Sequence, residues 1–273
     1  MAPPDSRPGR DLGLSPTGDL GSSPIRLLEE LGVKPGNDMQ HSRMADLSLF
    51  PPDNFFEQAE ILVTKASPIV LGKVVPHLED YPGRWNPGGF MVFPLGIHHV
   101  LGSLRLHVYP EGMPRNTPQG PNIHNHAWHL FSNVLVGSYT DTLYALEPSG
   151  RTTDPEAIYP GSGLLRVFET RRNPGGQDRL TTDGTIVRPV PLVNRQASAG
   201  QVHTIEADIV YHLPTVSPEQ LTATLVLDSH AFAVSTQVLL DSASLQIDRT
   251  RVTVDPSSVL LVKAQMMKAQ VLK

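Results

Sequence analysis

The spacing of hydrophobic and polar positions changes about a third of the way along the chain. Before about residue 88 the apolar side chains recur at intervals of three and four, as on one face of a helix. From Gly88 onward they come in short, often alternating segments that are separated by glycine and proline. The pattern therefore predicts a mainly β chain that carries short helices near its N-terminal end.

Three helices are expected in the first part of the chain. The first begins after Ser23, which stands where an N-cap belongs and is followed by proline, and it ends at Gly32. The second starts at Asp53 and breaks before Pro68, since proline lacks the N–H that a helix interior needs. A third helix is expected over 70–78.

Short strands are expected throughout the second part of the chain. Several such strands without helices between them are typical of an antiparallel sandwich or barrel. The segment 146–185 has the weakest pattern and is expected to form loops around one hairpin. The expected strands cover residues 90–93, 104–109, 134–139, 163–170, 185–193, 200–205 and 221–228.

The chain of 273 residues is long enough for one large domain with additions at both ends. Residues 1–23 are rich in Pro, Gly, Ser and Asp and are expected to be a flexible leader. A helical N-terminal decoration is expected over 24–87, a β-barrel over 88–250, and a C-terminal segment over 251–273, with helical propensity from Val259 onward.

Composition excludes several classes of protein. A net charge of −5 gives no electrostatic footprint for nucleic acid. There is no apolar run of membrane-spanning length, and the N-terminus lacks the features of a signal peptide, so a cytoplasmic protein that does not bind membranes is expected. The absence of cysteine excludes disulfides, thiolate nucleophiles and cysteine metal ligands.

Histidine is the residue type that suggests chemistry. His124 and His126 are two positions apart in a segment that reads as a strand, so both project from one face. Neutral imidazoles suit zinc, copper, iron and nickel, and such a pair predicts part of a metal site. A third ligand could be His203 or His212; a chance pair with no metal is the alternative. His129 is expected to support the site by hydrogen bonding or packing rather than to bind the metal.

Two separated segments resemble a known family. The run from Ile123 to His129, followed by the glycine and the T-L-Y strand of 135–144, resembles the first motif of the cupins, and in particular that of the cysteine dioxygenase type. The second motif of that type, I-x-x-x-I-x-x-H, is matched by the segment from Ile205 to His212. The resemblance covers about residues 104–145 and 200–230. It implies a double-stranded β-helix (jelly-roll) barrel and selects His212 over His203 as the third ligand.

The resemblance implies a non-haem Fe(II) oxygenase, resembling a dioxygenase, that acts on a small molecule with O2. Many cupins add a glutamate ligand after the histidine pair, but residues 127–134 contain no carboxylate, as in the three-histidine branch. His129 and Tyr139 are expected to take part in catalysis beside the metal ligands. The alternatives are another divalent metal, a metal-dependent isomerase or lyase, and a cupin that binds a metal or ligand without turnover.

The chain departs from the thiol dioxygenases in ways that bear on the substrate. Neither Arg105 nor Arg115 fits the position of the family's substrate-binding arginine, and the family's Ser-His-Tyr relay is not recognisable in 221–228. Cysteine is therefore not the expected substrate. The sequence leaves the substrate and the oligomeric state open.

Overall fold

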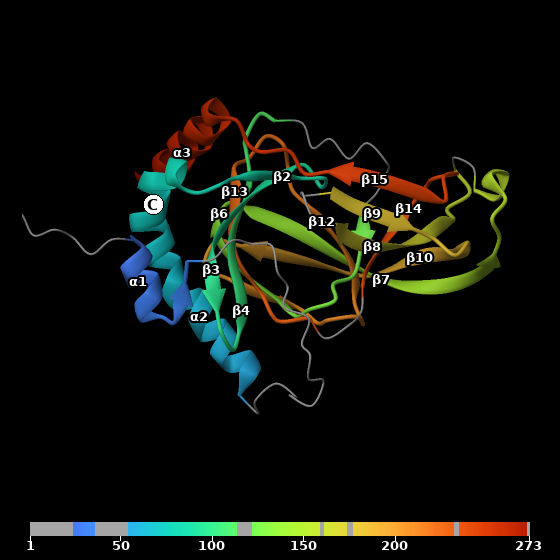
Figure 1. Cartoon of the computed structure of the whole chain (residues 1–273), viewed down its shortest axis with the longest axis horizontal. Helices are drawn as coiled ribbons and strands as arrows, with labels where there is room; N and C mark the ends of the chain where they lie inside the picture. Colours follow the sequence, from blue (N-terminus) through green and yellow to red (C-terminus); the bar gives the residue numbers. More distant parts are fainter. Residues whose placement is uncertain are drawn as a thin grey trace, which may run out of the picture.

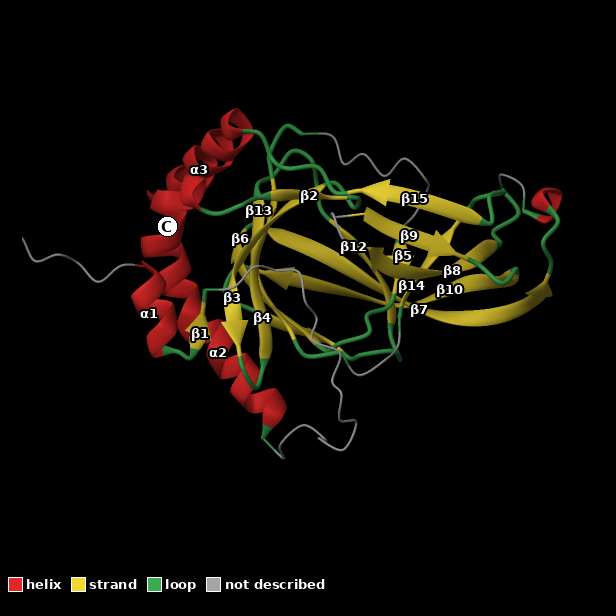
Figure 2. Cartoon of the chain, in the orientation of Figure 1, coloured by secondary structure: helices red, strands yellow, loops and turns green. Residues whose placement is uncertain are grey.

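The computed structural model describes residues 24–35, 54–113, 122–158, 161–173, 177–231 and 235–271. The expected leader, the cap at Ser23 and the helix start at Asp53 lie outside these residues. The described chain is mainly β and consists of two antiparallel sheets with helices on one side (Figures 1 and 2). The mainly β class expected from the sequence is confirmed.

The first sheet lies next to the helices (Figure 2). Its strands are, in spatial order, β1 (Val33–Lys34), β3 (Phe90–His98), β4 (Gly102–Tyr109), β13 (Thr222–Asp228), β6 (Leu130–Val136) and β11 (Val202–Ile205). A further short strand, β2 (Arg84–Asn86), pairs with β3 outside this order.

The second sheet lies on the side away from the helices. Its strands are, in spatial order, β10 (Thr185–Ser198), β7 (Ser138–Arg151), β12 (Tyr211–Thr215), β5 (Ile123–His124), β14 (Thr236–Leu240), β8 (Leu165–Asn173), β9 (Gln177–Thr181) and β15 (Gln246–Thr250). Strand β10 also pairs with β8 through residues 186–187.

The strand pairings are nested along the chain. Strand β4 pairs with β13, β5 with β12, β6 with β11, and β7 with β10. Successive pairs alternate between the first and the second sheet. The eight strands thus form one long antiparallel ribbon that is wound so that its turns lie in two facing layers.

Gly137 forms the corner at which the chain passes from one sheet to the other. It separates β6 of the first sheet from β7 of the second and has a φ of 73°. A Cβ at this position would lie 2.3 Å from the carbonyl oxygen of Leu221. Only glycine combines this left-handed conformation with so close an approach of another backbone segment.

The longest helical stretch runs through a proline. Helix α2 (Phe55–Ile69) continues as a π-helical turn, η1 (Val70–Val74), and a 3-10 turn, η2 (Val75–Asp80). The expected break before Pro68 was therefore wrong, and the helix expected over 70–78 is not α-helical. The α-helical geometry thus ends two residues after the proline, at Val70, and gives way to irregular turns.

Burial explains why the stretch stays helical despite the proline. Ala59, Val63, Ala66 and Val70 are fully buried and belong to one core cluster with the first sheet. By length and composition alone, the stretch Phe55–Asp80 could cross a membrane. Its buried apolar residues pack against the sheet, whereas Phe56 and Ile61 are exposed.

The other helices join the same core. Helix α1 (Pro24–Glu30) contributes Leu28, and α3 (Pro256–Val271) contributes Val259, Val262 and Met266. Lys263 of α3 also forms an ion pair of 2.7 Å with Glu79 of η2. The helical propensity expected for the C-terminal segment is confirmed, and its packing partner is the N-terminal helical stretch.

The side chains of β4 alternate between this core and a cavity between the two sheets. On β4, Leu104, Leu106 and Val108 face the helices, whereas Arg105 and His107 line a cavity between the sheets. This is the period of two that a strand imposes on its side chains. One face of the sheet therefore supplies stability and the other supplies polar groups.

The segment expected to form loops has more regular structure than expected. Strand β7 extends to Arg151, strand β10 begins at Thr185, and β8 and β9 form the expected hairpin between them. A short 3-10 turn, η3 (Pro155–Ala157), lies between β7 and β8. Backbone pairing of long strands maintains this part of the structure where the hydrophobic pattern of the sequence is weak.

A short segment after β15 connects the two sheets. The Trp85 N–H donates to the Val252 carbonyl at 2.7 Å, and the Val254 N–H donates to the Gly83 carbonyl at 3.0 Å. Strand β15 itself pairs with β9 of the second sheet. We call residues 251–254 the strap, because they join β2 of the first sheet to the end of the second.

Candidate metal centre

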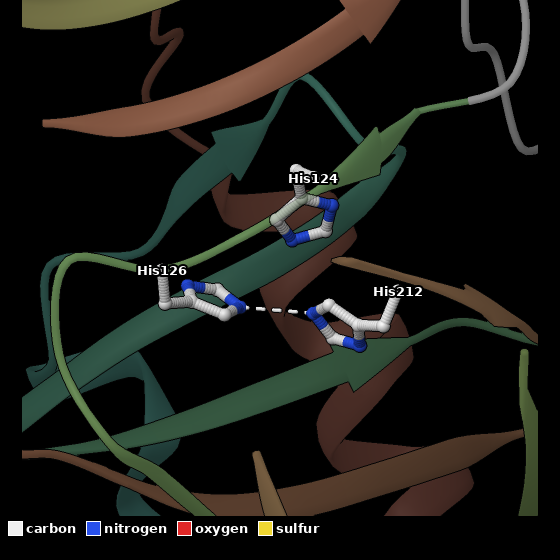
Figure 3. A group of neighbouring side chains, drawn as sticks. All are labelled: His124, His126 and His212. Atoms are coloured by element: carbon white, nitrogen blue, oxygen red, sulfur yellow. Dashed lines mark hydrogen bonds between the residues drawn. The ribbon is translucent and has the colours of Figure 1, made fainter. Parts of the chain in front are cut away.

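The structure brings three histidines together from two neighbouring strands (Figure 3). His124 ends β5, and His212 lies directly opposite it on β12. His126 follows two residues after His124, and its ring turns towards the same point as the other two (Figure 3). The pairing of β5 with β12 is thus what joins two segments that are far apart in the sequence.

The separation of the ring nitrogens fits one metal ion. One nitrogen from each ring lies within 4.8 Å of those of the others, and the Nε2 atoms of His126 and His212 are 3.0 Å apart. Two nitrogens that bind the same ion at about 2.1 Å, with a right angle between the two metal–nitrogen bonds, are about 3.0 Å apart. The three-histidine group can therefore hold a metal ion.

Hydrogen bonds orient two of the three rings. Nδ1 of His124 lies 2.8 Å from the Asn122 carbonyl, and Nδ1 of His212 lies 2.9 Å from Oδ1 of Asp141. Both acceptors require the proton on Nδ1, so the Nε2 lone pairs of both rings are available to a metal. Nδ1 of His126 is buried and has no hydrogen-bond partner among the described residues.

Burial keeps His124 and His126 neutral. It lowers the pKa of His124 to about 3, and the neighbouring His212 contributes to the shift. Burial also holds the pKa of His126 well below its ordinary value, with His124 and His212 adding to the effect. Neutral imidazole is the form that binds metal ions, so these rings are ready to coordinate at neutral pH.

Asp141 is a functional residue that the sequence reasoning missed. It lies on β7, is almost completely buried, and bonds His212 through Oδ1 and His203 through Oδ2, at 2.9 and 2.7 Å. Burial opposes its ionisation, but hydrogen bonds from His203 and His212 outweigh burial and hold its pKa below the usual range. A carboxylate that accepts from a metal-binding imidazole fixes the ring and strengthens it as a ligand.

A hydrogen-bonded loop positions His126. The buried side-chain oxygen of Asn125 accepts from the Gln237 N–H at 2.6 Å, and the backbone N–H of Asn125 donates to the Gln237 carbonyl at 3.0 Å. The Asp208 N–H donates to the His126 carbonyl at 2.7 Å, and Asp208 adopts a φ of 62°. A left-handed aspartate at this point is the kind of backbone strain that gathers at functional sites.

The three histidines line a cavity of about 220 Å³ between the two sheets. Its wall carries two ion pairs, Arg105 with Asp228 and Arg251 with Asp178. His107 also lines it, and burial lowers the pKa of this ring to about 3, with Arg105 and Arg251 as further causes. The cavity is large enough for a small organic molecule and combines apolar walls with convergent polar groups.

The other predicted site residues separate into two environments. Tyr139 lines the cavity, and burial raises the pKa of its phenol, which therefore stays protonated. The His129 ring packs against Phe55 and Phe56 of α2, and its Nδ1 accepts from the Ala207 N–H at 3.1 Å. His129 is not among the residues that line the cavity.

The structure places the two candidates for the third ligand differently. His212 joins His124 and His126, whereas His203 lines the same cavity but hydrogen-bonds to Asp141. Arg105 lies in the cavity wall, and Arg115 lies outside the described residues.

No family model and no curated protein matches this chain. Its function is therefore inferred from the site.

Proposed function

We propose that this protein is a non-haem Fe(II)-dependent oxygenase with a cupin fold, which oxidises a small molecule with O2 at the three-histidine site. The carrying observation is the donor set: in the described part of the chain, the group that can hold an ion consists of three imidazoles and no carboxylate. Three neutral ligands leave a divalent ion its whole charge and leave coordination positions for substrate and oxygen.

The nested strand pairing supports the proposed fold. A ribbon in which β4 to β7 pair in reverse order with β10 to β13, alternating between two layers, is the topology of a double-stranded β-helix. In such folds the site lies between the sheets, and this is where the cavity with His124, His126 and His212 is found.

When bound, Fe(II) supplies the activation of O2, and the residues of the chain supply binding and orientation. Asp141 and the Asn122 carbonyl hold two of the ligand rings by their Nδ1 atoms. The apolar cavity residues, among them Val92, Ile205 and Val238, exclude water from the reacting groups. Tyr139 offers a phenol that remains a hydrogen-bond donor.

Metal analysis of the purified protein tests the proposal. Fe(II) should bind at about one ion per chain, and His124→Ala, His126→Ala and His212→Ala should each reduce occupancy about tenfold or more, because each removes a ligand. His203→Ala, which removes a cavity histidine outside the group, should keep most of the metal. Oxygen-electrode screening of small-molecule pools should then find uptake that depends on Fe(II).

Other results would contradict the proposal at separate points. Tightly held zinc or nickel without oxygen uptake would favour a metal-dependent isomerase or lyase. Loss of metal in His203→Ala with retention in His212→Ala would overturn the ligand set. No metal binding and no stabilisation by any added metal would leave a non-catalytic binding protein.

A further inference from the structure

A second histidine shares the carboxylate that orients the metal site. Oδ2 of Asp141 lies 2.7 Å from Nε2 of His203, while Oδ1 lies 2.9 Å from Nδ1 of His212. His203 comes from β11 of the first sheet and His212 from β12 of the second, so the carboxylate separates and links them. His203 is not one of the three residues that can hold the ion.

The shared carboxylate fixes the tautomer of His203. Both carboxylate oxygens of Asp141 lie within hydrogen-bonding distance of a ring nitrogen, so the carboxylate accepts and each histidine donates. For His203 the donor is Nε2, which leaves the lone pair of the neutral ring on Nδ1. No described residue forms a hydrogen bond to this Nδ1.

The position of His203 makes this lone pair useful. The residue lines the same cavity as the three-histidine group, with its side chain 11 % exposed. Two titratable groups of β7, Asp141 and Tyr139, lie next to His203. The Tyr139 ring is edge-on to the His203 ring, with 6.0 Å between the ring centroids, and on the neighbouring strand β6 His203 is paired with Ser132. A buried carboxylate beside the ring stabilises the imidazolium that forms when Nδ1 takes a proton, the role that a paired aspartate has in acid–base catalysis.

We propose that His203 is the proton acceptor of this site, which takes the proton that a small-molecule ligand loses when one of its heteroatoms binds beside the three histidines. The O–H, N–H or S–H bond of the ligand breaks, its electron pair stays on the heteroatom, and the proton forms a bond to Nδ1 of His203. Asp141 stays a carboxylate and keeps its hydrogen bond from Nε2. This inference rests on the proposed function, because it requires a metal at the histidines.

Calorimetry with a protic probe tests the inference without knowledge of the substrate. Acetohydroxamic acid is titrated into Fe(II)-loaded protein, without oxygen, in two buffers of different ionisation enthalpy at about pH 7.5, above the ordinary histidine pKa of about 6.5. The difference in heat gives the number of protons released to the buffer. Wild-type protein should release far fewer than one proton per site, because His203 retains it. His203→Gln should release about one.

The substitution is chosen to keep the structure. The glutamine amide can still donate to Asp141, but it cannot accept a proton, so Fe(II) occupancy should remain close to that of the wild type. His107→Gln is the matched control, because His107 lines the same cavity and has no hydrogen-bonded carboxylate in the described part of the chain. Its proton count should equal that of the wild type.

The outcomes distinguish this inference from the proposed function. Equal proton release by wild type and His203→Gln, or an equal change in His107→Gln, would overturn the role of His203 and leave the metal site intact. If acetohydroxamic acid binds no better to Fe(II)-loaded wild type than to metal-free protein, the proposed function fails and the inference fails with it.

Discussion

Among single residues, Asp141 links two histidines of the cavity. Both of its carboxylate oxygens accept from imidazoles, and its side chain is 1 % exposed. A buried carboxylate is costly unless it is fully hydrogen-bonded, and here the two histidines compensate the cost. The residue therefore contributes to the metal site and to stability through the same two bonds.

Asp141→Asn should weaken metal binding by about 10- to 100-fold, because an amide is a poorer acceptor and can present its N–H to His212 in place of an oxygen. The measurement is competition for Fe(II) or Zn(II) with a chelator of known affinity. Asp183→Asn, which changes an exposed carboxylate that bonds Thr185, is the control and should keep wild-type affinity. Unchanged affinity in Asp141→Asn would show that the carboxylate does not tune the site.

The sequence predicts the ligands better than their support. His124 and His126 follow from strand alternation alone, whereas His212 is 86 residues beyond His126 and required a family motif. Asp141 could have been found, because it alternates with Tyr139 and Leu143 on the buried face of β7, where a carboxylate is unusual. Its two partners could not, because they depend on the pairing of β7 with β12 and on how the two sheets face each other.

At the scale of elements, the corner at Gly137 decides whether the ribbon can pass between the sheets. The strand segments on either side of it were expected as one stretch, 134–139, and the structure divides them between two sheets. Local hydrophobic pattern does not encode this change of direction, since residues with strand propensity, such as Val136 and Tyr139, lie on both sides. The long helical stretch shows the converse, because burial against the sheet overrides the local signal of Pro68.

Gly137→Ala should lower the free energy of unfolding by about 3 kcal/mol or more, because it adds a clash with the Leu221 carbonyl to an unfavourable φ. Gly112→Ala is the matched control: its φ is 76°, and no atom lies within 4 Å of the added Cβ. It should cost about 1 kcal/mol from the backbone conformation alone. Urea denaturation of the metal-free proteins measures both, and equal losses would remove the steric explanation.

At the scale of the whole molecule, the two faces of the first sheet have different tasks. One face packs on the three helices and the other closes a polar cavity with the second sheet. The mainly β class follows from the sequence, but the division of β4 into helix-facing leucines and cavity-facing Arg105 and His107 needs the structure. Alternation alone does not say which face meets which layer.

The buried neutral histidines predict how stability depends on pH. The pKa values of His107 and His124 are about 3 in the folded protein, against about 6.5 when unfolded. The unfolded chain therefore binds protons first, so their contribution is complete above about pH 6.5 and is lost as pH falls towards 3.

The free energy of unfolding of the metal-free protein should thus fall below about pH 6.5. Each of the two rings should add up to about 1.4 kcal/mol to this loss for each pH unit. Urea denaturation at a series of pH values between about 7.5 and 4.5 measures the slope. His107→Gln should make this dependence on pH shallower, because it removes the contribution of one of the two rings. A stability that does not change over this range would contradict the burial of both rings in neutral form.

The strap has a consequence for the order in which the protein is made. Residues 251–254 hydrogen-bond to the segment 83–85 and carry Arg251 into the cavity wall. A chain still on the ribosome has β2 available long before the strap is synthesised, so the cavity wall stays incomplete until the strap has been made. The cavity reaches its final shape only after Val254 has emerged and its N–H has bonded to the Gly83 carbonyl.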